Sequence, residues 1–574
     1  MKALKLLACE TAAYINRNKL KSAAVILAMV LAYGFYVTSY TLNVDDAFTS
    51  FWNGGRLIAA GRFSGYLVQL LTGIMTYSPF FTMFLALCIY YFAGIVTAVV
   101  LNRYAEGKLS DQAVFVFWMI YVTYPLISEQ MVYPIIVLLA LGFLMTAVAL
   151  WLTDRFYEEK SISSLVVAIG LMVLAIDFYE AFAAVYLTLM MASVLIRFFY
   201  SEDPSAKKLP AVFFRMLKLT AVLLAAIVIR FALSKLALFL YYGTTHAGYS
   251  GNNQIYWLQI GLLDCAIWLI RTVFFYYFWA GIDYFPIFLF ALCAIVGLIC
   301  SVVLSVRKKS AIPALGFLFM IAGALSLNVV LGIATNYTMA QPLTLFAAAS
   351  VMGFYIIAEK KKTWRYILGV LIVLLVLNQA KCLNNWSVAN YERYEYEMAV
   401  VDDIGQDLEE NYDVETKPVI FIGKNDAPLL PDALLKKHET QHPLVVALQK
   451  AAIRLSDAVL PKRFFSSIGG FYGHEVKNAS DLFSFVQRIR NRTSISSSYL
   501  SWATNDTVSW FSSYEDCTLS EETYALFEQR GYELLRCSNE AYETYASAGD
   551  ALPVYPKKGS IAEIGDYIYV NFGA

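Results

Sequence analysis

The chain has 574 residues, of which 59% are hydrophobic and only 15% are charged. Its mean hydropathy is +0.57, its net charge is zero and its pI is about 6.9. Soluble domains carry about a quarter charged residues, so this composition excludes an ordinary soluble protein. We expect a multi-pass membrane protein, with membrane lipid as a partner and no nucleic acid.

Apolar runs long enough to cross a bilayer recur before residue 382. Basic residues ahead of the first run place the N-terminus in the cytoplasm by the positive-inside rule. No cleavage site follows, so the first helix is predicted to remain as an anchor. The predicted spans are about 22–41, 79–101, 113–129, 133–152, 162–177, 180–197, 212–241, 285–306, 311–332, 340–358 and 364–381.

The segment 243–284 interrupts the simple alternation of sides. It begins outside, yet the basic stretch Arg307–Lys309 should be inside after a single further span. The apolar stretch Trp257–Trp279 is therefore predicted to be re-entrant or interfacial, with no net crossing. With about eleven crossings in total, the chain after residue 381 is predicted to be extracytoplasmic.

This tail, residues 382–574, is predicted to be a small α/β domain following a membrane domain of residues 1–381. The pattern predicts an acidic helix over Asn390–Asn411, a buried strand over Lys417–Gly423, a helix over Pro443–Leu460 and a closing strand over Tyr567–Phe572. Two cysteines of the tail, Cys517 and Cys537, could pair outside the cell; their spacing does not resemble a metal site.

Some basic residues are predicted on the outer side, against the usual bias. They are Arg56, Arg62 and Arg271, and, in the outer half of the seventh span, Arg230 and Lys235. An ionisable group at membrane depth is costly unless it is paired or functional. An anionic ligand, such as a donor phosphate, would explain several of them. The alternative is snorkelling, or ion pairing with Asp45, Asp46, Asp177, Glu180 or Asp264.

Two adjacent carboxylates, Asp45 and Asp46, follow the first span directly. One Asp could cap a helix that begins near Ala47. A cap does not explain both, and adjacent side chains point well apart. In the functional interpretation one carboxylate is a general base and the other orients it or raises its pKa.

A second acidic cluster, Asp177-Phe178-Tyr179-Glu180, forms the predicted tight outer turn between the fifth and sixth spans. It is either a polar turn that ends two helices or a contact for a sugar ring or acceptor, through Asp177, Tyr179 and Glu180. His246 is the only histidine before the tail, and one histidine makes no metal site.

The side of the membrane on which these residues are predicted to lie determines which kind of sugar donor a transferase could use. Nucleotide sugars are cytoplasmic, so a transferase acting outside would need a lipid-linked sugar. Cleaving a sugar from polyprenyl phosphate requires a base for the acceptor and positive charge for the departing phosphate.

At these residues the sequence resembles the Gtr-type, GtrII-like glucosyltransferases. The double Asp followed by Gly61-Arg62-Phe63 resembles that family's first outer loop, and Phe178-Tyr179-Glu180-Ala181 resembles its Tyr-Gln-Ala step, with Glu180 in place of the more usual Gln. The resemblance covers roughly residues 20–380. It implies a GT-C-like enzyme of the bacterial plasma membrane that moves glucose from a polyprenyl-phosphate donor to a cell-envelope glycan, as in O-antigen modification, with Asp45 or Asp46 as the base.

Two other functions share these features. A flippase for a lipid-linked glycan would also have many spans, but should expose basic residues to both leaflets and show repeat symmetry. A polysaccharide polymerase would use the same donor type. No cofactor is indicated, and the sequence leaves the sugar, acceptor, linkage and any divalent-cation requirement open.

Overall fold

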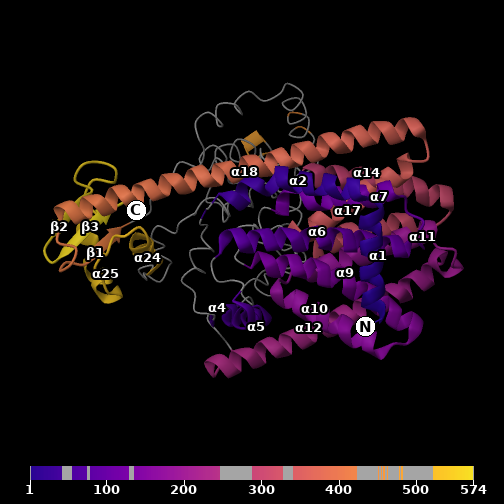
Figure 1. Cartoon of the computed structure of the whole chain (residues 1–574), viewed down its shortest axis with the longest axis horizontal. Helices are drawn as coiled ribbons and strands as arrows, with labels where there is room; N and C mark the ends of the chain where they lie inside the picture. Colours follow the sequence, from indigo (N-terminus) through magenta and orange to yellow (C-terminus); the bar gives the residue numbers. More distant parts are fainter. Residues whose placement is uncertain are drawn as a thin grey trace.

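The computed structural model of the protein describes residues 2–39, 41, 55–73, 78–127, 135–245, 288–326, 340–422 and 521–572, with isolated positions between 450 and 481. Within these residues the chain forms a helical bundle and, at one end, a small sheet (Figure 1). Seven of the described helices are long and apolar enough to cross a membrane.

The bundle is built from helices that differ widely in length. They are α1 (Lys2–Arg17), α2 (Lys19–Thr38), α4 (Gly55–Ala59), α5 (Phe63–Thr72), α6 (Pro79–Tyr104), α7 (Asp111–Thr123), α9 (Ile136–Glu159), α10 (Ile162–Phe178), α11 (Phe182–Tyr200), α12 (Leu209–Tyr242), α14 (Phe288–Lys308), α15 (Ile312–Ala324), α17 (Ala340–Ala358) and α18 (Lys362–Asn411), with short 3-10 turns at Pro125–Ile127 and Pro204–Lys207.

Each predicted span overlaps one of these helices. Local signals account for several of their ends: the hydroxyl oxygens of Ser110 and Ser161 accept from the first turns of α7 and α10, and α12 ends at Gly243 with φ 68°. The helices α7, α10 and α15 are shorter than the seven candidate spans. That all eleven cross the membrane stays a prediction, and most of the segment 243–284 lies outside the described residues.

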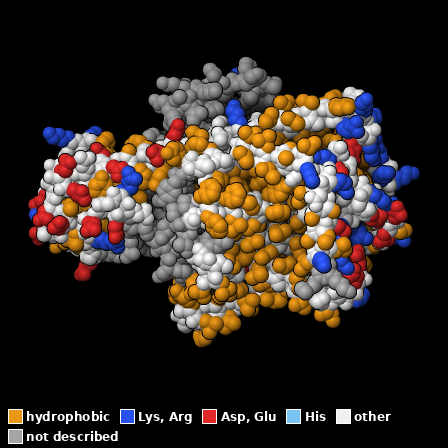
Figure 2. Space-filling model, in the orientation of Figure 1, with side chains coloured by type: hydrophobic (Ala, Val, Ile, Leu, Met, Phe, Trp, Pro, Cys, Tyr) orange, Lys and Arg blue, Asp and Glu red, His pale blue; other side chains and the backbone are white. Residues whose placement is uncertain are grey.

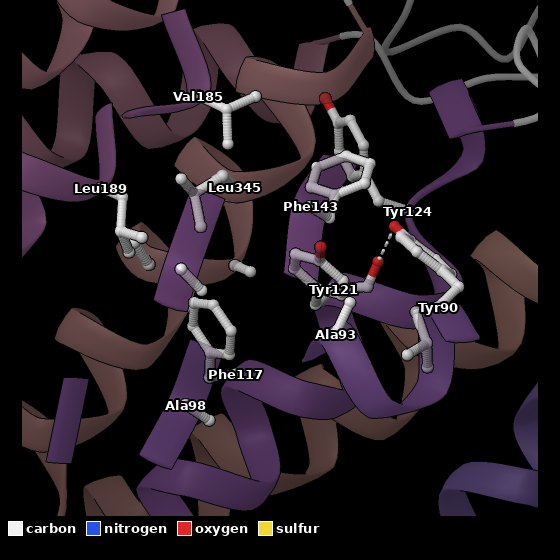
Figure 3. Packing of buried hydrophobic residues seen from close by; sticks show 14 of the residues in the cluster. Tyr90, Ala93, Ala98, Phe117, Tyr121, Tyr124, Phe143, Val185, Leu189 and Leu345 are labelled. Carbon is white, nitrogen blue, oxygen red and sulfur yellow. Dashed lines mark hydrogen bonds between the residues drawn. The ribbon is translucent and has the colours of Figure 1, made fainter. Parts of the chain in front are cut away.

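The bundle core is formed by close aromatic packing rather than by large apolar side chains alone. The Tyr90 and Tyr121 rings stack with centroids 4.9 Å apart, and the Tyr90 hydroxyl donates to the Tyr121 carbonyl oxygen at 2.7 Å (Figure 3). Phe143 continues this packing to Phe182, at 5.2 Å. A Cβ atom at Gly142 would lie 2.2 Å from the Phe182 ring, so the small residue allows the two helices to approach.

The connections predicted to be cytoplasmic meet at one end of the bundle. Glu10 pairs with Arg103, Lys108 pairs with Glu202, and the Ser110 hydroxyl donates to Glu359 at 2.6 Å. Figure 2 shows charged side chains at this end, a broad hydrophobic surface beside it, and further charges around the small sheet at the opposite end. This arrangement is the one expected if the positive-inside rule sets the topology.

The small sheet has strands β1 (Val419–Ile422), β2 (Ile561–Ile564) and β3 (Tyr567–Asn571) in the order β1-β3-β2. β3 pairs parallel to β1 and antiparallel to β2. Helices α24 (Glu521–Gln529) and α25 (Asn539–Tyr545) and a 3-10 turn at Ala546–Gly549 accompany it. Both strands predicted in this region are confirmed. The predicted helix Pro443–Leu460 and Cys517 lie mostly or wholly outside the described residues.

One prediction about α18 was wrong. The span 364–381 and the acidic helix Asn390–Asn411 were expected as separate elements, but they form one helix of 50 residues, about 75 Å long. No Gly or Pro lies between residues 370 and 404 to end it. The predicted domain boundary at 381/382 therefore falls inside a helix. Leu383 still packs in the bundle core, whereas Tyr394 and Leu408 belong to the core under the sheet.

Candidate active site

The turn between α4 and α5 carries Gly61 and Arg62. Gly61 has a φ of 74°, a left-handed conformation that residues with a side chain rarely adopt. Its N–H donates to the Ile58 carbonyl oxygen (2.9 Å), and the Arg62 N–H donates to that of Leu57 (2.7 Å). This tight turn directs α5 against α10 and places Arg62 immediately ahead of it.

The start of α5 is capped from another helix. The Asp177 carboxylate, at the end of α10, accepts from the Ser64 backbone N–H at 2.7 Å and also from the Ser64 hydroxyl. The first N–H groups of a helix lack partners within the helix, so a carboxylate here stabilises α5. Asp177 has no exposed side-chain surface. It therefore ties α10 to the turn that carries Arg62.

Arg230 and Ser234, both on α12, complete a cluster with Asp177 and the turn that carries Gly61 and Arg62. Arg230 Nη2 donates to the Gly61 carbonyl oxygen at 3.0 Å, and Arg230 Nε lies 3.4 Å from Asp177 Oδ1. The Ser234 hydroxyl donates to the same Gly61 oxygen, also at 3.0 Å. Residues four apart on a helix lie on one face, so both side chains reach the turn.

Glu180 lies between two guanidinium groups. Its Oε1 accepts from Arg230 Nη2 at 2.7 Å, and its Oε2 is 3.6 Å from Arg62 Nη2. The Arg62 guanidinium also lies over the Tyr179 ring, 5.0 Å from the centroid. The positive charges of Arg62 and Arg230 favour the ionised form of the Glu180 carboxyl. Glu180 is thus an anion at neutral pH.

The structure therefore brings together Arg62, Arg230, Asp177, Tyr179 and Glu180, which the sequence placed on three separate segments. Arg62 and Arg230 both form ion pairs with carboxylates of the chain. Ion pairing was the alternative to ligand binding in the sequence analysis. Such pairing does not exclude a ligand, because the same guanidinium groups bind carboxylates and phosphates alike.

The other candidate residues lie elsewhere or outside the described part of the chain. Lys235 is five residues after Arg230, on a different face of α12, and its Nζ donates to the Thr245 carbonyl oxygen at 2.8 Å. The Arg56 backbone belongs to α4, but its side chain is not described. The remaining candidates, Asp45, Asp46 and Arg271, lie outside the described residues.

The chemistry of the described cluster is that of an anion site rather than a metal site. Two arginines converge on one partly exposed carboxylate, the geometry in which phosphate is also held. Among the described residues, no group of three or more His, Cys, Asp and Glu side chains could hold a metal ion.

Ser64 and Ser234 were missed by the sequence interpretation. Ser234 had a usable signal, because it lies four residues after Arg230, in a run that is otherwise apolar except for Lys235, and so shares the face of Arg230. Ser64 had none, since its partner Asp177 is 113 residues away in the sequence.

Comparison with known protein families gives one match. The model of the family glucosyl transferase GtrII matches residues 34–358, more than half of the chain. The matched stretch contains every candidate site residue named above, and the small sheet lies beyond it. No curated protein matches the chain significantly.

Proposed function

Because the chain belongs to the glucosyl transferase GtrII family, we propose that it transfers a sugar, with glucose the first candidate, from a polyprenyl-phosphate-linked donor to a cell-envelope glycan. The match confirms the family resemblance inferred from the sequence and supports glycosyltransferase activity. The donor, the acceptor and the side of the membrane are the steps that we add.

The observation that carries the proposal is the convergence of Arg62 and Arg230 on Glu180. Figure 1 places α4 and α5 toward the end of the bundle that faces the sheet, away from α1 and the basic connections. Basic residues at that end oppose the usual charge bias, and a phosphate at the membrane surface supplies a reason for them.

In the proposed reaction, the acceptor hydroxyl oxygen attacks the anomeric carbon of the donor sugar. The new carbon–oxygen bond forms as the bond from that carbon to the phosphate oxygen breaks, and the electron pair leaves on the phosphate. The hydroxyl proton passes to the carboxylate of Asp45 or Asp46, while the neighbouring carboxylate orients it. Arg62 and Arg230 stabilise the phosphate that departs.

The other predicted residues take supporting parts. Arg56 and Arg271 are further candidates for the donor phosphate, and Lys235 is a weaker one because it contacts Thr245. Tyr179 offers an aromatic face for a sugar ring. Asp177 is fully buried and bonded on both oxygens, so we assign it to positioning the Gly61–Ser64 turn rather than to direct sugar contact.

The decisive experiment incubates the purified protein with radiolabelled polyprenyl-phosphate glucose and, in parallel, with a radiolabelled nucleotide glucose. We expect label in extracted envelope glycan from the lipid-linked donor only. Transfer from the nucleotide sugar alone would contradict the proposed donor. Movement of the lipid-linked sugar between leaflets without transfer would identify a flippase instead.

The side of the membrane is tested separately. A cysteine introduced near Asn411, at the end of α18, should react with an impermeant thiol reagent on intact cells. Protection until the cells are lysed would place the sheet in the cytoplasm, and the argument for a lipid-linked donor would fail with it.

A further inference from the structure

Glu180 differs from the other carboxylate of the cluster in how firmly it is held. Asp177 is fully buried and accepts from Ser64, while Arg230 and Ser234 lie against its second oxygen. Glu180 lies at the edge, with 38% of its side chain exposed, and its described side-chain partners are the two arginines. Glu180 can therefore leave the arginines without uncapping α5, whereas Asp177 cannot.

The charges of the described cluster cancel. Arg62 and Arg230 are positive, and Asp177 and Glu180 are negative. An incoming phosphodiester with one negative charge would meet no net positive charge from these four residues while Glu180 remains in place. Once Glu180 withdraws into solvent, the other three carry one net positive charge, which matches the ligand. Carboxylate and phosphate oxygens also use the same guanidinium nitrogens, so both cannot occupy them at once.

We propose that Glu180 is a built-in competitor that occupies the anion site of Arg62 and Arg230 in the free protein and is displaced by the phosphate of the donor. The identity of the ligand rests on the function proposed above. The return of Glu180 also speeds product release, because a polyprenyl monophosphate carries more negative charge than the sugar-bearing phosphodiester and would otherwise bind more tightly.

The test is Glu180→Gln in the full chain, reconstituted in nanodiscs. Glutamine keeps the shape and can still accept a hydrogen bond from Arg230, but it carries no charge. The probes are a short-chain isoprenyl phosphate glucose and the matching isoprenyl monophosphate. Since Glu180 is partly exposed and screened, we expect each to bind about two- to fivefold more tightly to the variant, with slower release of the monophosphate.

Two further variants make this result specific. Glu10→Gln removes a carboxylate from Arg103 at the opposite end of the bundle and should leave both affinities unchanged. Glu180→Asp restores the charge and should return binding toward that of the unmodified chain. Thermal unfolding of each variant checks that the fold is retained.

Equal or weaker binding of both probes by Glu180→Gln, together with unchanged reactivity of Arg62 and Arg230 toward an arginine reagent, would overturn the competitor role. Weaker binding of the glucose-bearing probe alone would also overturn it and would identify Glu180 as a sugar contact.

A second readout separates this inference from the proposed function. Phenylglyoxal modifies arginine, and mass spectrometry locates the modified residues. In Glu180→Gln, Arg62 and Arg230 should react faster, and inorganic phosphate should protect them at lower concentration. If this holds while the isoprenyl probes bind no better, Glu180 guards an anion site that the donor does not use, and the proposed donor role fails instead. If the reactivity is unchanged, the competitor role fails.

Discussion

The two ends of the bundle hold their arginines in different ways. At the end with the basic connections, Arg103 donates through Nε and Nη2 to the two oxygens of Glu10, at 2.6 Å each. At the other end, Arg62 and Arg230 share the partly exposed Glu180, and Arg230 also lies against the buried Asp177. A pair with one carboxylate per arginine ties two elements together. Two arginines on one exposed carboxylate also present a site that a phosphate can take over.

Buried carboxylates show what the two ends have in common. Asp154 pairs with Arg215 at the basic end, and Asp177 lies beside Arg230 at the other, with 7% and 0% of their side chains exposed. Each joins α12 to a neighbouring helix. The charged side chains of the bundle are therefore of two kinds. Buried ion pairs hold helices together at both ends, whereas the role of the partly exposed side chains differs between the ends.

The largest expected effect tests the proposed general base. Asp45→Asn or Asp46→Asn should lower transfer by about 10²–10⁴-fold, because the acceptor hydroxyl loses its proton acceptor. Loss of a helix cap would instead cost about 1 kcal/mol of stability. Single-turnover transfer and thermal unfolding are measured together. Asp111→Asn, which weakens the Arg17 pair at the basic end, is the control. If both variants remain active and only unfold earlier, the capping alternative is correct.

The second prediction compares the buried carboxylates. Asp154→Ala should lower the free energy of unfolding by about 3 kcal/mol, because it leaves the largely buried Arg215 without its carboxylate. Asp177→Ala should cost a similar amount, because it uncaps α5 at Ser64 and removes one of the two carboxylates beside Arg230. Only Asp177→Ala should also reduce transfer, because it frees the turn that carries Arg62. Denaturant unfolding in detergent and transfer assays measure the two effects. Equal loss of transfer in both variants would show that activity merely follows stability.

The third prediction concerns the arginine that follows the paired Asp. Arg62→Lys should raise the KM for the donor about tenfold, since lysine cannot reproduce two parallel hydrogen bonds to phosphate. The KM for the acceptor should stay nearly constant. Arg103→Lys, which disturbs the Glu10 pair and the contact with the Trp151 ring at the opposite end, should leave both constants unchanged. Unaltered donor dependence in Arg62→Lys, and likewise in the Lys variants of Arg56 and Arg271, would leave these arginines as structural ion-pair partners.

The smallest expected effect belongs to single hydroxyl groups. Ser234→Ala removes the hydrogen bond to the Gly61 oxygen, and Ser201→Ala removes one to Glu106 at the basic end (2.7 Å). Each should cost about 1 kcal/mol of stability. Ser234→Ala should in addition raise the donor KM slightly, because the turn before Arg62 loosens. If Ser201→Ala raised the donor KM by the same amount, donor binding would not depend specifically on the end that carries Arg62.

The sequence alone determined the features that depend on local patterns. Hydropathy located a helix in each predicted span, because a bilayer core requires about twenty consecutive apolar residues. Short buried runs located β1 and β3, and the motifs around Asp45, Arg62 and Glu180 indicated the family that the comparison then confirmed. These signals need no knowledge of which helices are neighbours.

Tertiary structure decided which of those residues meet. Arg230 reaches Gly61 across 169 residues of sequence, and Asp177 reaches Ser64 across 113, through the packing of α10 and α12 against the α4–α5 turn. No periodicity encodes such contacts. Tertiary structure also decided the length of α18. The apolar pattern ends with the predicted span, but the helix continues, because its backbone hydrogen bonds persist in water and its far end is buried against the sheet.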